Sequence, residues 1–188
     1  LEPERLGRWG RLRIGLARTV GATADASELA RRLEWTTLPD GSRVAALAFA
    51  APGAQGLRLG VRAEQVPVGT VLRFYGAPGS PVVELDAAAL ATLRTLNEQA
   101  GLDADAARMA WGPDTDGPVG TLEVQLPPDV ATEDLRLAVP QLSHLVQTVA
   151  QAVAQKDQRD IGAAGSCNLD VMCTAYQDEG RAVAKILF

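Results

Sequence analysis

Few side chains in this sequence are of the types that carry out nucleophilic chemistry. His144 is the single histidine, and Ser143 precedes it. A serine nucleophile needs a histidine base beside it and a carboxylate that orients the base. The segment around His144 alternates apolar and polar residues without the glycines of a nucleophile turn, and Ser166, in Gly-Ser-Cys, lacks that context too. These residues do not make up a catalytic triad, and we expect no catalytic residue in the chain.

Cys167 and Cys173 are the two cysteines of the chain and stand close together near its end. One histidine and two cysteines lack the paired spacing of a zinc site, so we expect neither a metal nor another cofactor. The two thiols could form a local disulfide, because a hairpin can bring their Cα atoms within the ~4.4–6.8 Å that a disulfide needs. Two free thiols are the alternative. Both residues are therefore disulfide candidates.

Asp114 and Asp116 form an Asp-x-Asp-Gly arrangement that could offer oxygen ligands to calcium. No glutamate follows at the spacing of a calcium-binding loop, so an ordinary turn is the preferred interpretation. The tryptophans, Trp9, Trp35 and Trp111, are scattered along the chain. This spacing favours core packing over a sugar-binding platform.

A polar, charged run, Gln155-Lys-Asp-Gln-Arg-Asp160, follows the more apolar part of the chain. Such a run is typical of an exposed linker, and exposed linkers are preferred sites of proteolysis. An enzyme that cuts after basic residues would find Lys156 and Arg159 there. A solvated charge run is the alternative interpretation, and it is compatible with cleavage.

Short apolar segments with a period of two predict strands ahead of this linker. Leu122, Val124 and Leu126 show the clearest alternation. Further strands are predicted over 12–16, 44–50, 57–62, 71–75 and 135–139. We expect segment 44–50, which is almost wholly apolar, to be buried on both faces. Segment 142–155 fits either a helix face or a strand that continues into a loop or short helix, and we favour the strand.

One long helix interrupts the predicted strands, after a shorter possible helix over 25–33. Asp86 is a suitable N-cap, Leu90, Leu93 and Leu96 recur at helical spacing, and Gly101 suits the position after the last turn. These signals predict a helix over 87–100. Short strands separated by glycine and proline turns, with one inserted helix, are typical of an antiparallel β-sandwich.

The composition excludes several classes of partner. The chain has 188 residues, 47% of them hydrophobic, which suffices for one domain and a fragment of another. A net charge of −5 without a basic cluster argues against nucleic acid or an acidic membrane as a partner. No apolar run reaches the roughly 18 residues of a membrane span.

The end of the chain carries a family resemblance. Gly162-Ala-Ala-Gly-Ser-Cys-Asn-Leu-Asp-Val-Met-Cys173, followed by Arg181-Ala-Val-Ala-Lys-Ile-Leu-Phe188, resembles the mature N-terminus of secreted bacterial trypsin-like serine proteases of the lysyl endopeptidase branch. The resemblance implies that the catalytic residues lie in later motifs, which this chain lacks. It also implies that Cys167 and Cys173 each bridge to a different cysteine deeper in the protease domain.

Segments upstream of the linker are similar to the pro-region of such proteases. The residues that carry this looser resemblance are Leu33-Glu-Trp, Leu38-Pro-Asp-Gly, Ala51-Pro-Gly-Ala, Trp111-Gly-Pro, Gly120-Thr-Leu-Glu-Val and Leu142-Ser-His-Leu145. Many sandwich domains share such turn and strand residues. Their order along the chain, ending in the mature start, adds weight to the resemblance.

The residues and the resemblance together predict a mainly β chain in three parts. Residues 1–155 would form the β-sandwich pro-domain, 156–165 an exposed linker with the activation cleavage, and 166–188 the first strand of an incomplete trypsin-like β-barrel. We expect a secreted, extracellular or periplasmic pro-region that acts as folding template and latency inhibitor for its own serine protease domain. The chain by itself should be inactive, and the preference for Lys or Arg and the oligomeric state stay open. The alternative is a stand-alone extracellular sandwich that binds glycans or mediates adhesion.

Overall fold

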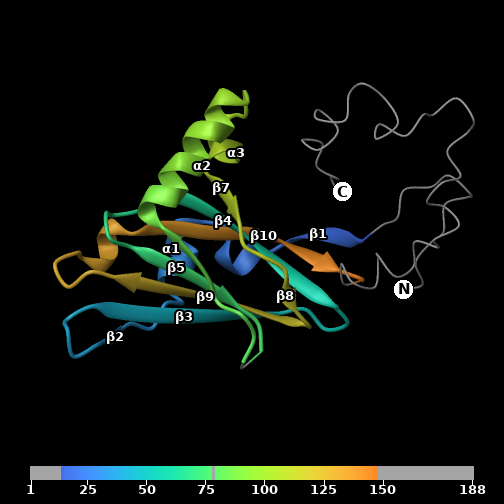
Figure 1. Cartoon of the computed structure of the whole chain (residues 1–188), viewed down its shortest axis with the longest axis horizontal. Helices are drawn as coiled ribbons and strands as arrows, with labels where there is room; N and C mark the ends of the chain where they lie inside the picture. Colours follow the sequence, from blue (N-terminus) through green and yellow to red (C-terminus); the bar gives the residue numbers. More distant parts are fainter. Residues whose placement is uncertain (1–13, 78, 148–188) are drawn as a thin grey trace, which may run out of the picture. The chain divides into compact units, whose positions relative to one another are not determined.

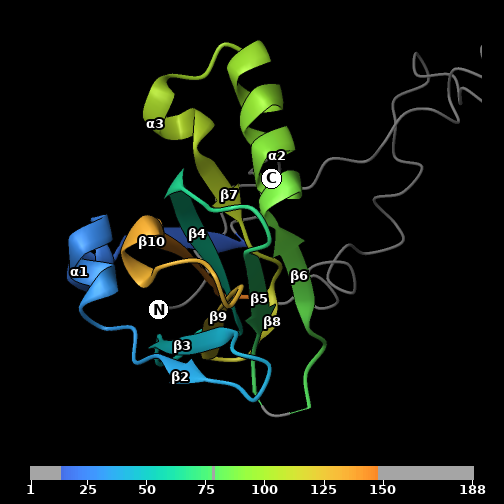
Figure 2. The same ribbon diagram turned by 90° about the vertical axis from the view of Figure 1, so that its left-hand side faces the viewer.

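The structure is a computed structural model that describes residues 14–147 except residue 78. Its elements, labelled in Figures 1 and 2, are mostly short antiparallel strands. They are β1 (Gly15–Thr19), α1 (Ala26–Ala30), β2 (Thr36–Thr37), β3 (Arg43–Ala50), β4 (Gly56–Gln65), β5 (Val71–Tyr75), β6 (Val83–Asp86), α2 (Ala87–Gln99), α3 (Ala104–Ala107), β7 (Met109–Trp111), β8 (Thr115–Asp116), β9 (Val119–Leu126) and β10 (Arg136–Leu145), with 3-10 turns at Gly21–Thr23 and Thr132–Asp134. The predicted mainly β, antiparallel character is confirmed.

The strands form two five-stranded sheets. One has the order β1-β10-β4-β7, with β8 also paired to β4, and the other has the order β2-β3-β9-β5-β6. Every pairing is antiparallel. Strand β9 lies at the centre of the second sheet, which agrees with its strong alternation in the sequence.

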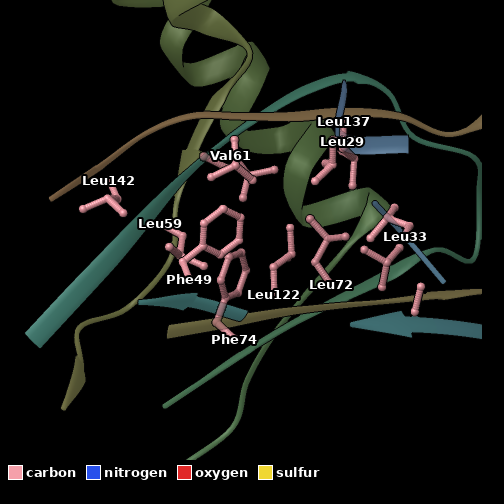
Figure 3. Close-up of a cluster of buried hydrophobic side chains, with 14 of the residues drawn as sticks. Leu29, Leu33, Phe49, Leu59, Val61, Leu72, Phe74, Leu122, Leu137 and Leu142 are labelled. Carbon is pink, nitrogen blue, oxygen red and sulfur yellow. The ribbon is translucent and has the colours of Figure 1, made fainter. Parts of the chain in front are cut away.

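Both sheets contribute to one hydrophobic core. Alternate residues of β4, β5 and β9 are almost fully buried: Leu57, Leu59, Val61, Leu72, Phe74, Leu122, Val124 and Leu126. Figure 3 shows Leu59, Phe74 and Leu122 pointing toward one another from different strands. Leu29 of α1 joins this cluster, and the Thr23 hydroxyl beside α1 donates to the Val139 carbonyl at 2.8 Å. The period-two pattern therefore identified the core faces of these strands.

Strand β3 is not buried on both faces as expected. Its inward residues Ala45 and Phe49 are buried, whereas Ala46, Ala48 and Ala50 are exposed. The period of two is present but hidden, because alanine occupies the outward positions where polar residues usually mark the solvent side. The prediction from composition was wrong on this point.

Strand β10 runs through Pro140 as one long element. Its first half is the strand predicted over 135–139. Its second half begins the segment at Leu142 for which we favoured a strand. The register with β4 shifts between Ala138 and Gln141, so the proline, which cannot donate to the ladder, lies in an irregularity. The Pro140 carbonyl still accepts from the Val20 amide at 2.9 Å.

Helix α2 ends within one residue of its predicted limit and carries the predicted caps. The Asp86 carboxylate accepts from the Ala89 amide at 2.7 Å. At the other end Gly101 has φ +80°, its amide donates to the Glu98 carbonyl, and the amide of the next residue donates to Asn97. This pair of bonds is a Schellman motif, which needs a residue in the left-handed region and therefore favours glycine.

Candidate functional site

The chain leaves the domain beside the edge strand β1. The Val146 amide donates to the Ile14 carbonyl at 3.0 Å, and the Gln55 amide donates to the Leu145 carbonyl at 2.8 Å. These bonds hold the last described residues between the start of β1 and the start of β4. Residue 147, the last described residue, therefore lies at this end of the first sheet.

A groove opens next to this exit point. It has a volume of about 380 Å³ and lies between β1, β10 and the end of β3. Its lining residues are Arg18, Thr19, Val20, Phe49, Ala50, Ala51, Pro52, Leu142 and His144. β1 is an edge strand in the described part of the chain, so the groove borders an unpaired row of backbone groups.

His144 lines this groove but is not part of a catalytic pair. It is 9% exposed and pairs with Leu16 and Leu57 in the ladder, whereas Ser143 pairs with Ala17 and Arg58. Successive residues of a strand point to opposite faces of the sheet, so the serine hydroxyl and the imidazole face away from each other. The arrangement cannot transfer a proton between the two side chains.

A helical arm made of α2 and α3, residues 87–107, projects from the sheets in both views (Figures 1 and 2). Only Leu90 of α2 is buried, and Leu93 lines a hollow between the helix and strands β4 and β7. Leu93, Leu96 and Leu102 are 36%, 55% and 47% exposed. Apolar side chains that gather on an exposed element typically mark an interaction surface. The helical spacing of the leucines thus predicted the helix. It did not predict which of these leucines stay exposed.

Polar bonds fix the helical arm in place. The side-chain amide of Asn97 donates through Nδ2 to the carbonyls of Ala107 and Met109 at 3.2 and 3.3 Å. A smaller hollow of about 140 Å³ lies under α2, between the helix and strands β4 and β7. The exposed leucines therefore belong to an anchored element and are presented in a defined orientation.

The outward face of the second sheet carries an ion-pair network. Arg73 contacts Glu84 at 2.6 Å and Glu123 at 3.0 Å, and the Tyr75 hydroxyl donates to Glu123 at 3.1 Å. The hydrogen bond to Glu84 raises the pKa of the Arg73 guanidinium, and burial followed by the Glu123 hydrogen bond raises the pKa of Tyr75. Every charge in this network is paired, so it stabilises the sheet surface without an obvious reactive group.

The loop with Asp114 and Asp116 holds one buried carboxylate oxygen. Asp114 Oδ1 is buried and, among the described residues, has no hydrogen-bond partner. It lies so close to Gly56 that a Cβ there would be 2.1 Å away. Within residues 14–147, excluding 78, no three His, Cys, Asp or Glu side chains gather as a metal site would require.

Replacing Asp114 with asparagine should stabilise the domain at neutral pH. Burial raises the pKa of the Asp114 carboxyl, Asp116 raises it further, and Arg58 opposes both. The ordinary pKa of this carboxyl is 3.8, and its pKa in the folded domain is higher. At pH values between the two, the folded domain binds more protons than the unfolded chain, so the stability of the domain falls as the pH rises through that interval. The gain at pH 7 should not exceed about 1 kcal/mol because water screens a partly exposed carboxyl.

Denaturant titrations of wild type and Asp114→Asn at several pH values check this expectation. The two curves should converge below pH 3.8, where the carboxyl is protonated in both states. An equal difference at all pH values would contradict the burial of the charge as its cause.

The tryptophans differ in environment. Trp35 packs partly buried against the core, as expected, whereas Trp111 is 39% exposed with the Arg58 guanidinium 5.9 Å from its ring centroid. Trp9 lies outside the described residues. Core packing is therefore the wrong interpretation for Trp111.

Several predicted sites fall outside the part of the chain that the structure describes. They are the cleavage candidates Lys156 and Arg159 and the disulfide candidates Cys167 and Cys173. The limits at 155 and 165 and the first barrel strand lie there as well. Residue contacts divide the chain into units Leu1–Thr148 and Val149–Phe188. Among the described helices, none has the length and apolar character needed to cross a membrane.

Comparison with known proteins identifies the family. The family model described as the lysyl endopeptidase N-terminal domain matches residues 4–146. The chain is 33% identical over 167 residues to the lysyl endopeptidase of Pseudomonas aeruginosa. The aligned region covers 83% of this chain and 32% of that protein. The matched region is thus about a third of the relative's length. No solved structure matches the chain significantly.

The family match covers the described domain almost from end to end. It begins before β1, spans both sheets and the helical arm, and stops one residue after β10. The chain belongs to the family of lysyl endopeptidase N-terminal domains.

Proposed function

We propose that this chain is the pro-region of a secreted, lysine-directed serine endopeptidase precursor, in which it acts as folding template and latency inhibitor. The observation that carries the proposal is the family match over 4–146 to the N-terminal domain of a lysyl endopeptidase. Two thirds of the Pseudomonas relative lie outside the matched region and provide room for a catalytic domain. The resemblance of residues 162–188 to a mature protease start supports the same order of parts.

The template role follows from the folding problem of a trypsin-like barrel. Its strands pair between distant parts of the sequence, and such topologies fold slowly because loop closure precedes the stabilising contacts. Among the described residues, the present domain has a core of its own, to which both sheets and helices α1 and α2 contribute. A domain with its own core can fold before the protease barrel does. Its interpretation as a sandwich fits the two sheets that share this core. A folded partner that binds the native-like barrel stabilises it by mass action.

The docking surface of this proposal is the helical arm. Leu93, Leu96 and Leu102 are exposed apolar side chains on an element that Asn97 anchors. A protease surface that covers them would remove this apolar area from water. The groove beside β1, next to the last described residues, is the second candidate surface.

Activation would follow from cleavage in the linker, at Lys156 or Arg159. Before cleavage the tether keeps the domain at a high effective concentration near the protease, which favours the latent complex. Cys167 and Cys173 would pair with later cysteines of the protease domain, so the linker cut would separate two individually stable parts. Such disulfides need an oxidising environment, which the extracellular space or the periplasm provides after secretion.

An inhibition titration tests the proposal. A fragment of residues 1–148, which contains the core of the described residues, is added to the mature protease of the same precursor. We expect stoichiometric inhibition with a dissociation constant below about 1 μM, which corresponds to more than about 8 kcal/mol of binding. Full protease activity at a large excess of the folded fragment would contradict the latency role.

A stand-alone binding domain is the second candidate function. Trp111 is exposed beside Arg58, and exposed aromatic side chains are the usual contact surfaces for sugars. Calorimetric titration with cell-wall glycans would show saturable heat if this function holds. The loss of that heat in a Trp111→Ala variant would locate the contact.

A further inference from the structure

Residues 1–147 contain arginine but no lysine. The sequence has fourteen arginines and no lysine in this stretch, whereas residues 148–188 contain two of each. The chain therefore does use lysine, but only outside the region of the described domain. The first lysine is Lys156, in the predicted linker.

Some arginines make contacts that a lysine could not reproduce. Arg73 pairs with two glutamates through different nitrogens, and Arg62 bonds both the Ala24 carbonyl and Glu64. Arg58 lies over Trp111 and also donates to a backbone carbonyl. A planar guanidinium with five donors suits such sites, whereas an ammonium is a compact point charge. The fold explains arginine at these positions.

Other arginines have no such requirement. The side chains of Arg31, Arg94 and Arg136 are 64%, 46% and 55% exposed, and each pairs with a single glutamate. Lysine forms surface pairs of this kind equally well. The contacts therefore leave the absence of lysine at these exposed positions unexplained.

Two exposed arginines occupy a turn where proteolysis would begin. Arg31 and Arg32 follow α1 and precede the extended segment that leads to β2. Exposed turns are preferred cleavage sites, and a cut here needs only the last turn of α1 to open, where the amides of Arg31, Arg32 and Leu33 donate to the carbonyls of Ser27, Leu29 and Ala30. A lysine here would expose the domain to a lysine-directed enzyme.

We propose that the domain is free of lysine so that the lysine-directed protease it restrains cannot consume it. This inference rests on the proposed function. Hydrolysis of the Lys156–Asp157 bond adds hydroxide to the Lys156 carbonyl carbon and a proton to the Asp157 nitrogen, and the linker is severed. The released domain stays whole and remains bound as an inhibitor, and the protease regains activity only when the complex dissociates or another enzyme degrades the domain.

The linker offers an internal comparison for the cleavage step. Lys156 and Arg159 both lie in Gln-x-Asp sequences, so their immediate neighbours are identical. The relative rates of cleavage at the two bonds therefore report the preference for the cation itself. A protease that accepted arginine would cut both bonds and would also attack the turn at Arg31 and Arg32.

The test uses the whole 188-residue chain and the mature protease of its precursor, followed by intact mass and by residual inhibition over time. Three variants each introduce one lysine: Arg31→Lys and Arg32→Lys in the turn, and Arg94→Lys within α2 as the matched control. For wild type we expect cleavage after Lys156 to be roughly 100-fold faster than after Arg159. The fragment that ends at Lys156 should persist and keep inhibiting.

At least one turn variant should be cut inside the domain about tenfold or more faster than Arg94→Lys, since helical backbone must open before it can be cut. Its inhibition should decay at the rate of this cut. Turn variants that persist like wild type, or wild-type cleavage after an arginine within 1–147, would overturn the inference. A third outcome separates the two proposals: the wild-type domain resists cleavage but never inhibits, and a turn variant is cut. This outcome would refute the latency function while confirming that the lack of lysine protects the domain from cleavage.

Discussion

Replacing Leu93 and Leu96 with glutamate should weaken inhibition of the protease by roughly 100-fold or more, which corresponds to about 3 kcal/mol of binding free energy. Both side chains are exposed in the free domain, at 36% and 55%. Glutamate favours helix about as well as leucine, so α2 should keep its structure. In the complex, however, two unpaired carboxylates would lose water against an apolar surface, which is costly.

The matched control for this prediction is Leu38→Glu. Leu38 is 37% exposed and lies in the turn between β2 and β3. These two strands lie away from the helical arm in both views (Figures 1 and 2). This change should leave the inhibition constant within about threefold of wild type, because surface changes outside an interface cost little. Equal weakening by the two changes would show that the arm is not the docking surface.

Truncating Phe74 to alanine should destabilise the domain by about 3–5 kcal/mol, the usual cost of removing a buried aromatic ring. Phe74 is 1% exposed and lies between the sheets in Figure 3. The melting temperature should fall by roughly 10 °C for a domain of this size. Chemical denaturation measures the change, and inhibition should be lost when the domain unfolds.

Gly112 provides the control that locates this effect. A Cβ at Gly112 would lie 2.6 Å from Phe74 Cδ1, so the ring packs directly on the glycine backbone. Gly112→Ala should therefore cost about 1–3 kcal/mol in wild type. In the Phe74→Ala background the clash is gone, and the two effects should differ from additivity by at least about 1 kcal/mol. Strict additivity would mean that the two residues do not share this contact.

Elements with strong periodicity were predictable from the sequence. β9 and α2 carry their patterns and caps in local residues, and both are found within two residues of their expected limits. The edge strands β2, β6, β7 and β8 were missed, because segments of two to four residues are too short to show a period. Pro140 concealed the continuity of β10, since its irregular register with β4 depends on pairing between distant segments.

The candidate surface could not be predicted from residue types alone. Leu90, Leu93 and Leu96 have the same chemistry, yet only the first is buried. What separates them is how each packs against the rest of the fold, which is a property of the tertiary structure. The groove beside β1 likewise arises from β1, β3 and β10, which are far apart in the chain.

Refolding of the denatured protease with and without the domain shows whether the domain acts as a folding template. Mature protease is unfolded, diluted into buffer with an equimolar 1–148 fragment or with none, and assayed after further dilution to a concentration at which the complex dissociates. Recovered activity should be much higher with the wild-type domain than without it, and the Phe74→Ala variant should give little gain above its melting temperature. Equal recovery with and without the domain would contradict its role as a folding template.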